Sequence, residues 1–166
     1  MNIVLIGMRG AGKTTVAKLL SEKLKNPYIE TDELVEKKAN MTIPQIVEKY
    51  GWEYFRDIES EVIREISKKD GVVISSGGGL FTKLENVKAL KQKGKFFWLQ
   101  VGIDSILKRI GDDPNRPSLT GKKSRREDMD NILQERKQLY KSAADEVIDT
   151  ENRSADEVAK IIIEKL

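Results

Sequence analysis

The residues with the clearest chemical pattern stand near the start of the chain, in the stretch GMRGAGKTT at positions 7–15. Gly7, Gly12, Lys13 and Thr14 fit the spacing G-x-x-x-x-G-K-[ST], the signature of a phosphate-binding loop. Glycines let successive backbone N–H groups point inward as an anion nest, and a helix beginning near Lys13 would add the positive end of its dipole. The pattern therefore predicts a nucleoside triphosphate site.

The side chains of this loop have separate predicted tasks. The Lys13 ammonium would place a full charge on the β- and γ-phosphates, and the Thr14 hydroxyl is the kind of ligand that Mg²⁺ takes beside a nucleotide. Thr15 is open to two interpretations, a cofactor contact or packing that supports the loop, and Arg9 is expected to face solvent. The loop residues predicted to bind the cofactor are Gly10, Ala11, Gly12, Lys13, Thr14 and Thr15.

The chain as a whole has 166 residues and contains neither cysteine nor histidine. Disulfides, thiolate or imidazole metal ligands and histidine bases are therefore excluded, and catalysis would use carboxylates, Lys, Arg, hydroxyls or backbone groups. With 39% hydrophobic and 34% charged residues, the composition predicts one packed domain over residues 1–166. A net charge of +3 is too small to indicate binding to nucleic acid or to a membrane.

No apolar segment approaches the roughly 20 residues that span a bilayer, and the start of the chain does not resemble a secretory signal. A cytoplasmic location is therefore expected. The cationic run KKSRR at 122–126 is interpreted as the solvated edge of a loop and the start of a helix, in preference to a nucleic-acid site.

Hydrophobic patterning alternates between strands and helices along the chain. The expected strands are 2–6, 27–29, 72–75, 95–101 and 145–150, and the expected helices include 14–24, 32–39, 51–69 and 104–110. Strands separated by helices favour a parallel, doubly wound sheet, so the predicted fold class is α/β. Thr42 with Gln45, and Ser154 with Glu157, have the spacing of capping boxes at helix starts. Residues 111–126 lack apolar periodicity and predict a long loop.

Chemistry-bearing residues follow two of the expected strands. The acidic tip ETD stands at 30–32 after the second strand, and the glycine triplet GGG stands at 77–79 after the third. Because the carboxyl ends of parallel strands open on one crevice, these groups should meet the phosphate-binding loop in a site with room for a second substrate. The chain lacks the N-K-x-D sequence of a GTPase and the clear acidic pair of a helicase or motor.

These motifs together resemble the shikimate kinase family, and the resemblance covers nearly the whole chain. It is carried by GMRGAGKTT, ETD for the family's D-x-D, FRDIE at 55–59 for F-R-x-x-E, GGG, RP at 116–117, and ERKQLYKSAA at 135–144 for R-x-x-x-Y-x-x-x-A. The resemblance implies a three-layer α/β/α fold of the P-loop kinase type, with a central five-stranded parallel sheet and a mobile lid at about 111–126.

The resemblance also implies an acceptor site. Asp32 would hold the hydroxyls of shikimate and help to orient or deprotonate the 3-hydroxyl, while Arg56 and Arg136 would clamp its carboxylate. Gly78 would offer backbone close to the ring. These roles are chemically reasonable, because the planar fork of an arginine fits a carboxylate with two parallel hydrogen bonds.

Four further roles follow from the same resemblance. Arg116 would lie on the lid that closes over ATP, where it could neutralise charge on the transferred phosphoryl group. Arg109 and Arg153 match positions that flank the adenine, and Ser75 matches a position near the water shell of Mg²⁺.

The sequence departs from the family pattern at two positions. Glu30 stands where the family has the first Asp of D-x-D, and it is one methylene longer. The family's contact with the water shell of Mg²⁺ could therefore be displaced, or kept by a shifted rotamer, and Glu30 is retained as a metal contact. The lid reads RPSL where the family commonly has R-P-L-L, so Ser118 changes the apolar packing of the lid but not its arginine.

Simpler structural interpretations compete with these roles. Arg56 and Glu59 are three residues apart in an expected helix and could form only a surface ion pair. The glycine triplet could be a turn that needs positive φ, and Asp32 could be a helix cap. Trp52 and Phe55 could line the substrate pocket, but aromatic residues on a helix more often pack in the core, so they are not assigned to the site.

The predicted function is ATP-dependent phosphorylation of the 3-hydroxyl of shikimate in the pathway to aromatic amino acids, with ATP and Mg²⁺ as cofactors and a monomer as the expected state. One alternative is another P-loop small-molecule kinase, of the gluconate type or acting on nucleoside monophosphates. Another is a regulatory ATP-binding module without catalysis, against which the presence of Lys13, Thr14, Asp32 and Arg116 argues.

Overall fold

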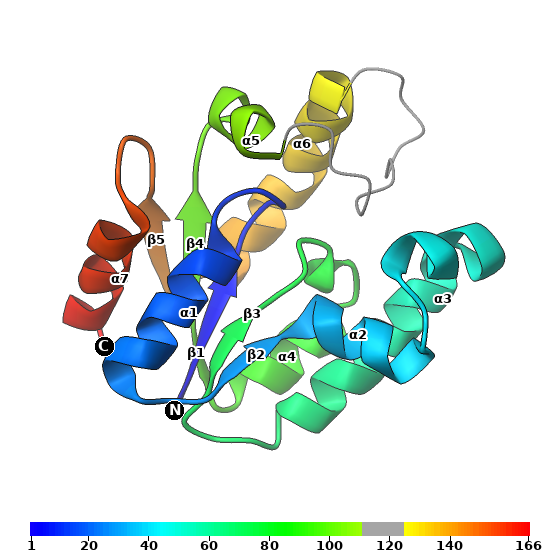
Figure 1. Cartoon of the computed structure of the whole chain (residues 1–166), viewed down its shortest axis with the longest axis horizontal. Helices are drawn as coiled ribbons and strands as arrows, with labels where there is room; N and C mark the ends of the chain where they lie inside the picture. Colours follow the sequence, from blue (N-terminus) through cyan, green and yellow to red (C-terminus); the bar gives the residue numbers. More distant parts are fainter. Residues whose placement is uncertain (111–124) are drawn as a thin grey trace.

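The computed structural model describes residues 1–110 and 125–166. Most of the predicted lid at 111–126, including Arg116 and Ser118, lies outside the described residues. In the described part, strands and helices alternate along the chain, and the predicted α/β class is confirmed (Figure 1). None of the helices in this part is long and apolar enough to cross a membrane.

The centre of the fold is a five-stranded parallel sheet with the strand order β2-β3-β1-β4-β5. Its strands are β1 Asn2–Ile6, β2 Tyr28–Glu30, β3 Val73–Ser75, β4 Gly94–Gln100 and β5 Glu146–Asp149. Each strand begins and ends within one residue of the positions that the sequence predicted. Strand β1 is apolar on both faces because Ile3 and Leu5 join one hydrophobic core while Val4 and Ile6 join the other.

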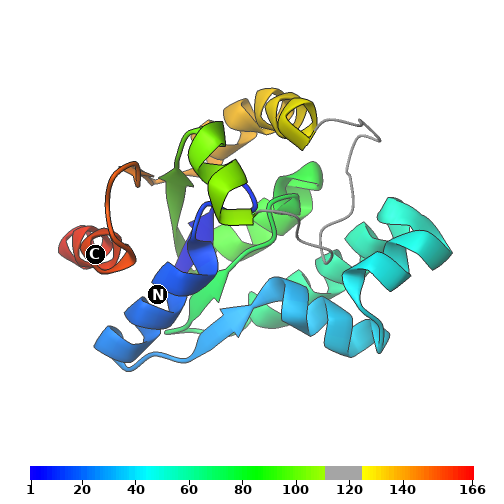
Figure 2. The same ribbon diagram turned by 45° about the horizontal axis from the view of Figure 1, so that its top comes forward.

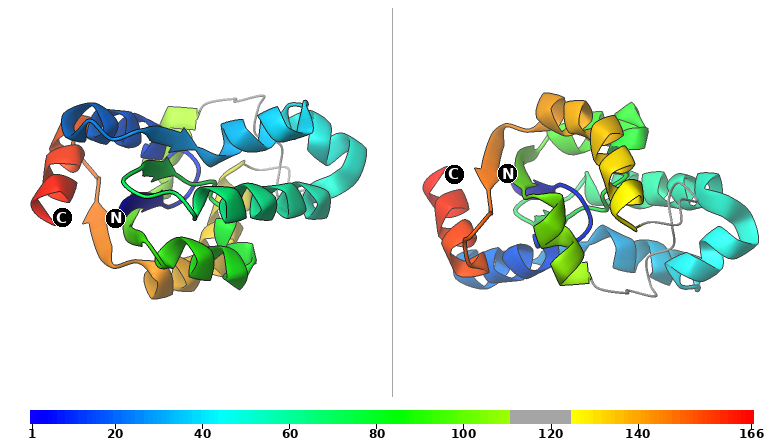
Figure 3. Two further views of the ribbon diagram at one scale, coloured as in Figure 1. Left: turned by 90° about the horizontal axis from the view of Figure 1, so that it is seen from below. Right: turned by 90° about the horizontal axis from the view of Figure 1, so that it is seen from above.

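Helices cover both faces of the sheet. They are α1 Lys13–Leu24, α2 Thr31–Ala39, α3 Ile43–Ile66, α4 Leu84–Lys91, α5 Ile103–Ile110, α6 Arg125–Ala143 and α7 Ala155–Glu164, with the short 3-10 helix η1 at Leu80–Thr82. The core on one face takes side chains from α1 and α7, and the core on the other takes them from α3, α4 and α6 (Figure 3). The predicted three-layer α/β/α arrangement is therefore present.

The strand order places a crevice at the carboxyl end of β1, which is the direct neighbour of both β3 and β4. The chain leaves β1 there, forms the loop 7–12 and enters α1 (Figure 1). In Figure 2, α5 lies beside this loop, while α2 and the first part of α3 project from the other side of the crevice. Ligands of doubly wound sheets bind at such a switch point, so the fold brings the predicted motifs to one edge.

Helix α3 joins two segments that the sequence suggests separately. It starts with the predicted capping box, in which the Gln45 amide donates to Thr42 Oγ1 at 3.3 Å and the Thr42 amide donates to Gln45 Oε1 at 2.9 Å. Gly51 breaks the helix with φ 86° and ψ 171°, a conformation that glycine adopts readily. At the second predicted box the Glu157 amide donates to Ser154 Oγ at 3.1 Å.

Candidate functional site

The loop between β1 and α1 is closed around the Lys13 side chain. Lys13 Nζ donates to the carbonyl oxygens of Gly7 and Met8, both at 2.8 Å, and only 8% of the residue is exposed. Gly10 and Gly12 have φ of 80° and 93°, so the turns that aim the loop's backbone require residues without a Cβ. The loop therefore holds a positive charge and the start of α1 at the carboxyl end of β1.

A cavity of about 330 Å³ opens in front of this loop, and we call it the phosphate cavity. It is lined by Arg9, Gly10, Gly12, Lys13, Thr14, Thr15, Glu30, Asp32, Ser75, Ser76, Gly77, Gly78 and Arg109. A side cavity of about 210 Å³ adjoins it and shares Gly12, Thr15 and Arg109 with it. Ala11 and Arg153 also line this side cavity. Thr15 is exposed and lines both cavities, and its contact with the cofactor stays a prediction.

A third cavity, which we call the acceptor cavity, lies between the glycine triplet and α3. It is lined by Arg9, Asp32, Ile43, Trp52, Phe55, Arg56, Gly77, Gly78, Gly79 and Arg136. The acceptor and phosphate cavities share Arg9, Asp32, Gly77 and Gly78, so they meet at the Asp32 carboxylate. Its free volume is about 30 Å³, so its side chains must move apart to admit a ring-shaped acid.

Trp52 and Phe55 form one wall of the acceptor cavity, and they also pack in the hydrophobic core, so both interpretations of these aromatic residues hold. Their rings meet edge to face at 5.5 Å between centroids. The Arg56 guanidinium carbon lies 5.6 Å from the Trp52 ring centroid and 4.9 Å from that of Phe55. Helical spacing cannot separate these two roles, because a cavity wall and a core face have the same periodicity.

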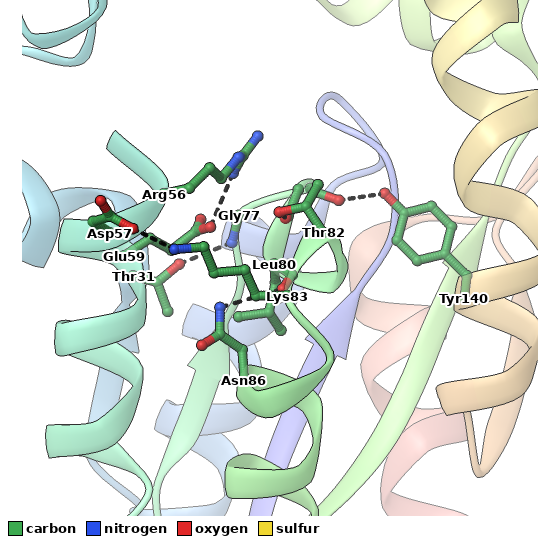
Figure 4. Close-up of polar contacts among 12 residues, drawn as sticks. Thr31, Arg56, Asp57, Glu59, Gly77, Leu80, Thr82, Lys83, Asn86 and Tyr140 are labelled. Atoms are coloured by element: carbon green, nitrogen blue, oxygen red, sulfur yellow. Dashed lines mark hydrogen bonds and ion pairs between the residues drawn. The ribbon is translucent and has the colours of Figure 1, made fainter. Parts of the chain in front are cut away.

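Arg56 is both an ion-pair partner and a cavity residue. Its Nη1 donates to Glu59 Oε1 at 2.9 Å, so the predicted i, i+3 pair exists, but it is buried and not on the surface. Glu59 is 0% exposed, and Figure 4 shows the pair beside Gly77. Burial raises the pKa of the Glu59 carboxyl, Arg56 opposes the rise, and the nearby Asp32 carboxylate adds to it.

Glu59→Gln is expected to change how the stability of the protein depends on pH. Folding raises the pKa of Glu59, so the protonated carboxyl contributes to the unfolding free energy. This contribution is fully present below the pKa of the unfolded state and is lost as the pH rises through the pKa of the folded state. Relative to the parent protein, the Gln variant should therefore gain stability in urea titrations as the pH rises above the unfolded pKa of the glutamate.

Glu61→Gln is the matched control, because Glu61 lies two residues further along α3 with an exposed side chain. Its unfolding free energy should follow that of the parent across the same pH range. A difference between the Glu59 variant and the parent that stays constant with pH would contradict the burial argument.

The glycine triplet is held by hydrogen bonds from two helices (Figure 4). The Gly77 amide donates to Thr31 Oγ1 at 2.8 Å, and the hydroxyl of the fully buried Tyr140 donates to the Gly78 carbonyl at 2.6 Å. None of the three glycines has a positive φ, so the interpretation as a positive-φ turn is wrong. They are needed for space, because a Cβ on Gly79 would lie 2.0 Å from Arg56 Nη2.

Two other structural interpretations are also corrected. Asp32 is not the cap of α2, because Glu30 occupies the cap position and Asp32 lies inside the first turn, 7% exposed. Arg9 does not face solvent: its Nη2 lies 3.4 Å from Asp128 Oδ2, and its side chain is only 11% exposed. Arg9 also lines both main cavities. The sequence could not signal this pair, because 119 residues separate its members.

Oxygen atoms that could serve as metal ligands lie at the end of the phosphate cavity near Thr14. Thr14 Oγ1 donates to Glu30 Oε2 at 2.7 Å, and the Tyr28 hydroxyl donates to the same oxygen at 2.8 Å. Burial, aided by the Glu30 carboxylate, raises the pKa of the Tyr28 phenol, so it remains a donor. Ser75 Oγ is buried without a hydrogen-bond partner among the described residues.

Hydroxyl and carboxylate oxygens are the donors that Mg²⁺ prefers, so these residues fit the ion. In the part of the chain that the structure describes, no cluster of three or more His, Cys, Asp or Glu residues could hold a metal by itself. A Mg²⁺ ion here would therefore depend on nucleotide phosphates for its remaining ligands, as is usual for this ion.

The sheet topology, the phosphate-binding loop and a second cavity that meets it define a P-loop kinase of the small-molecule type. A family model described as "Shikimate kinase" matches residues 9–166. The shikimate kinase of Thermodesulfovibrio yellowstonii is 42% identical over 164 residues, covering 99% of this chain and 94% of that protein. The chain belongs to the shikimate kinase family, and it is an ATP-dependent phosphotransferase with an alcohol acceptor.

Solved structures agree with this assignment. The structure described as shikimate kinase from Acinetobacter baumannii in complex with shikimate has a TM-score of 0.94 at 35% identity, covering 99% of this chain and 91% of that one. Shikimate kinase from Aquifex aeolicus has a TM-score of 0.84 at 38% identity, covering 99% and 95%. Both likenesses extend over the whole fold described above.

Proposed function

We propose that this chain transfers the γ-phosphoryl group of ATP to the 3-hydroxyl of shikimate, giving shikimate 3-phosphate and ADP in the pathway to aromatic amino acids. The observation that carries the proposal is the meeting of a cavity lined by Arg56 and Arg136 with the phosphate cavity at Asp32. A carboxylate ligand held by the two guanidinium groups would have its hydroxyls close to the point where the cavities join.

The acceptor cavity suits a small cyclic acid. Arg56 and Arg136 can each bind a carboxylate with a planar fork, and two forks fix both its position and its orientation. Trp52 and Phe55 offer an apolar wall to the ring, and Gly78 lets the backbone approach it. A nucleoside monophosphate would need these arginines for its phosphate and would need room for a base.

Asp32 is proposed to align the acceptor hydroxyl and to accept its proton. The hydroxyl oxygen then forms the new bond to the γ-phosphorus while the bond to the β,γ-bridging oxygen breaks, and ADP keeps the electron pair of that bond. Lys13 and the amides at the start of α1 stabilise the charge on the phosphates. Most of the rate enhancement comes from position and electrostatics, as is general for phosphoryl transfer.

Mg²⁺ is proposed to be held beside Thr14 and Glu30, with Ser75 near its water ligands. When bound, the ion neutralises charge on the β- and γ-phosphates. Arg109 and Arg153, which line the side cavity, are proposed to flank the adenine. Arg116 is proposed to act from the lid, although it lies outside the described residues. We propose that residues 1–166 act as one kinase unit and as a monomer.

Release of ADP, measured by a coupled assay with shikimate, gluconate and nucleoside monophosphates offered separately with Mg-ATP, tests the proposal. Shikimate should give sustained turnover well above the rate without an acceptor. A rate with gluconate or a nucleoside monophosphate alone would establish another small-molecule kinase. ADP release at background level with every acceptor would indicate an ATP-binding module without catalysis.

Gly79→Ala is expected to raise the KM for shikimate by about tenfold or more while leaving the KM for ATP unchanged. The new methyl group would overlap the Arg56 guanidinium and push it out of the cavity, at the cost of a charged hydrogen bond of about 1.5–3 kcal/mol. The backbone of Gly79, with φ of −96°, accepts an alanine without strain. Steady-state kinetics with each substrate varied in turn measure both constants.

The matched control is Gly102→Ala, because Gly102 lies outside the phosphate, acceptor and side cavities. There the new Cβ would lie 3.2 Å from the end of the Glu151 side chain. This variant should keep both KM values. An unchanged KM for shikimate in the Gly79 variant would remove Arg56 from the acceptor site.

A further inference from the structure

Tyr28 makes a contact that the proposed mechanism does not use. Its hydroxyl and Thr14 Oγ1 both donate to Glu30 Oε2, at 2.8 Å and 2.7 Å. Tyr28 and Glu30 are the first and last residues of the three-residue strand β2, so their side chains leave the same face of the sheet. Thr14 and Glu30 line the phosphate cavity, whereas Tyr28 does not. Tyr28 therefore influences that cavity through its neighbours, chiefly through the Glu30 carboxylate to which it donates and also through the nearby Thr14 hydroxyl.

The length of the Glu30 side chain explains why a second donor is useful. The carboxylate reaches the first turn of α1 directly, but a glutamate has one more rotatable bond than an aspartate and loses more rotamer freedom when it is fixed. Tyr28 is stiff by comparison, and Lys18 Nζ lies 5.7 Å from its ring centroid. A hydroxyl on this ring can hold the longer side chain in one orientation.

We propose that Tyr28 is a positioning residue that fixes the Glu30 carboxylate beside Thr14 and thereby raises the affinity of the nucleotide complex for Mg²⁺. Both described hydrogen bonds use Oε2, so Oε1 remains available to a water ligand of the ion. The inference rests on the proposed placement of Mg²⁺ beside Thr14 and Glu30. It does not depend on the identity of the acceptor, because neither Tyr28 nor the Glu30 carboxylate to which it donates lines the acceptor cavity.

Tyr28→Phe tests this role, because it removes the hydroxyl and keeps the ring. Calorimetric titration of Mg²⁺ into the complex of enzyme and ADP should show affinity about tenfold weaker than for the parent, in the range usual for outer-shell partners of metal ligands. Binding of ADP in the presence of a chelator and binding of shikimate should be unchanged. Tyr54→Phe, which removes a hydroxyl from a 42% exposed tyrosine of α3, is the control and should keep the parent affinity for Mg²⁺.

A double-mutant cycle with Glu30→Asp distinguishes a positioning role of the Tyr28 hydroxyl from a general contribution of that hydroxyl to the stability of β2. We expect the shorter carboxylate to lose at least one of the two hydrogen bonds, so Tyr28→Phe should change Mg²⁺ affinity less than twofold in the Glu30→Asp background. Equal losses in both backgrounds, or parent affinity in the single Tyr28 variant, would overturn the inference. Failure of the parent complex to bind Mg²⁺ would instead overturn the proposed metal site, so the two failures are distinguishable.

Discussion

Lys13→Met should reduce kcat at least about a thousandfold, the largest effect that we expect from a single substitution in this chain. The ammonium is held by the Gly7 and Met8 carbonyl oxygens in the lining of the phosphate cavity, and neutral methionine cannot stabilise charge on the β- and γ-phosphates. Removal of one such stabilising group from a water-poor site typically costs a hundredfold to a thousandfold or more. The coupled ADP assay at saturating shikimate measures the loss.

The substitution should also cost some stability, because Lys13 is buried and donates to two carbonyl oxygens. Losing these hydrogen bonds should lower the unfolding free energy by about 1–3 kcal/mol, and the variant should remain folded by circular dichroism. Lys37→Met on α2, where the side chain is exposed, is the control and should keep activity and stability. Retention of more than about a tenth of the parent kcat would exclude Lys13 from the proposed role.

The second large effect is expected at Arg136, where Arg136→Lys should raise the KM for shikimate about 10- to 100-fold. A lysine keeps the charge but replaces a planar fork by a point donor, so a bidentate contact worth about 1.5–3 kcal/mol is lost. Arg136 lines the acceptor cavity and not the phosphate cavity, and its Nη1 lies 3.1 Å from the position that a Cβ on Gly78 would take. The KM for ATP should therefore stay within about twofold of the parent value.

Arg64→Lys is the control for this substitution, because Arg64 is an exposed residue of α3 outside the acceptor cavity. It should leave both KM values unchanged. If Arg136→Lys left the KM for shikimate at the parent value, Arg136 would be removed from the acceptor site. If it raised both KM values equally, the effect would be on the fold or on α6 as a whole.

Much of the fold is predictable because its signals are local. Strand β1 is a short apolar run, and the glycine and lysine spacing at 7–15 is typical of a phosphate-binding loop between a strand and a helix. The capping box at Thr42 marks the start of α3 for the same reason. The break at Gly51 is less visible, since a glycine within a helical pattern does not state which φ it will adopt.

The contacts of the acceptor site are less predictable, because they depend on packing between distant elements. Arg56 and Glu59 have the spacing of an ion pair on a helix surface. Only the complete burial of Glu59 in the folded protein shows that this pair does not lie on the surface. Tyr140 lies in a motif of the sequence, but its hydrogen bond to Gly78 joins residues 62 positions apart. No periodicity or spacing encodes such a contact.

The sequence by itself determined the class of fold, the phosphate-binding loop and the set of charged residues from which the acceptor site is built, because these follow from local spacing and from the parallel sheet. Tertiary structure decided which of these residues meet. It placed Arg9 against Asp128 and joined the phosphate and acceptor cavities at Asp32. It also packed the Arg56 guanidinium so close to Gly79 that a side chain there would overlap it. Those outcomes depend on side-chain volumes and burial, which are properties of the packed molecule and not of any segment alone.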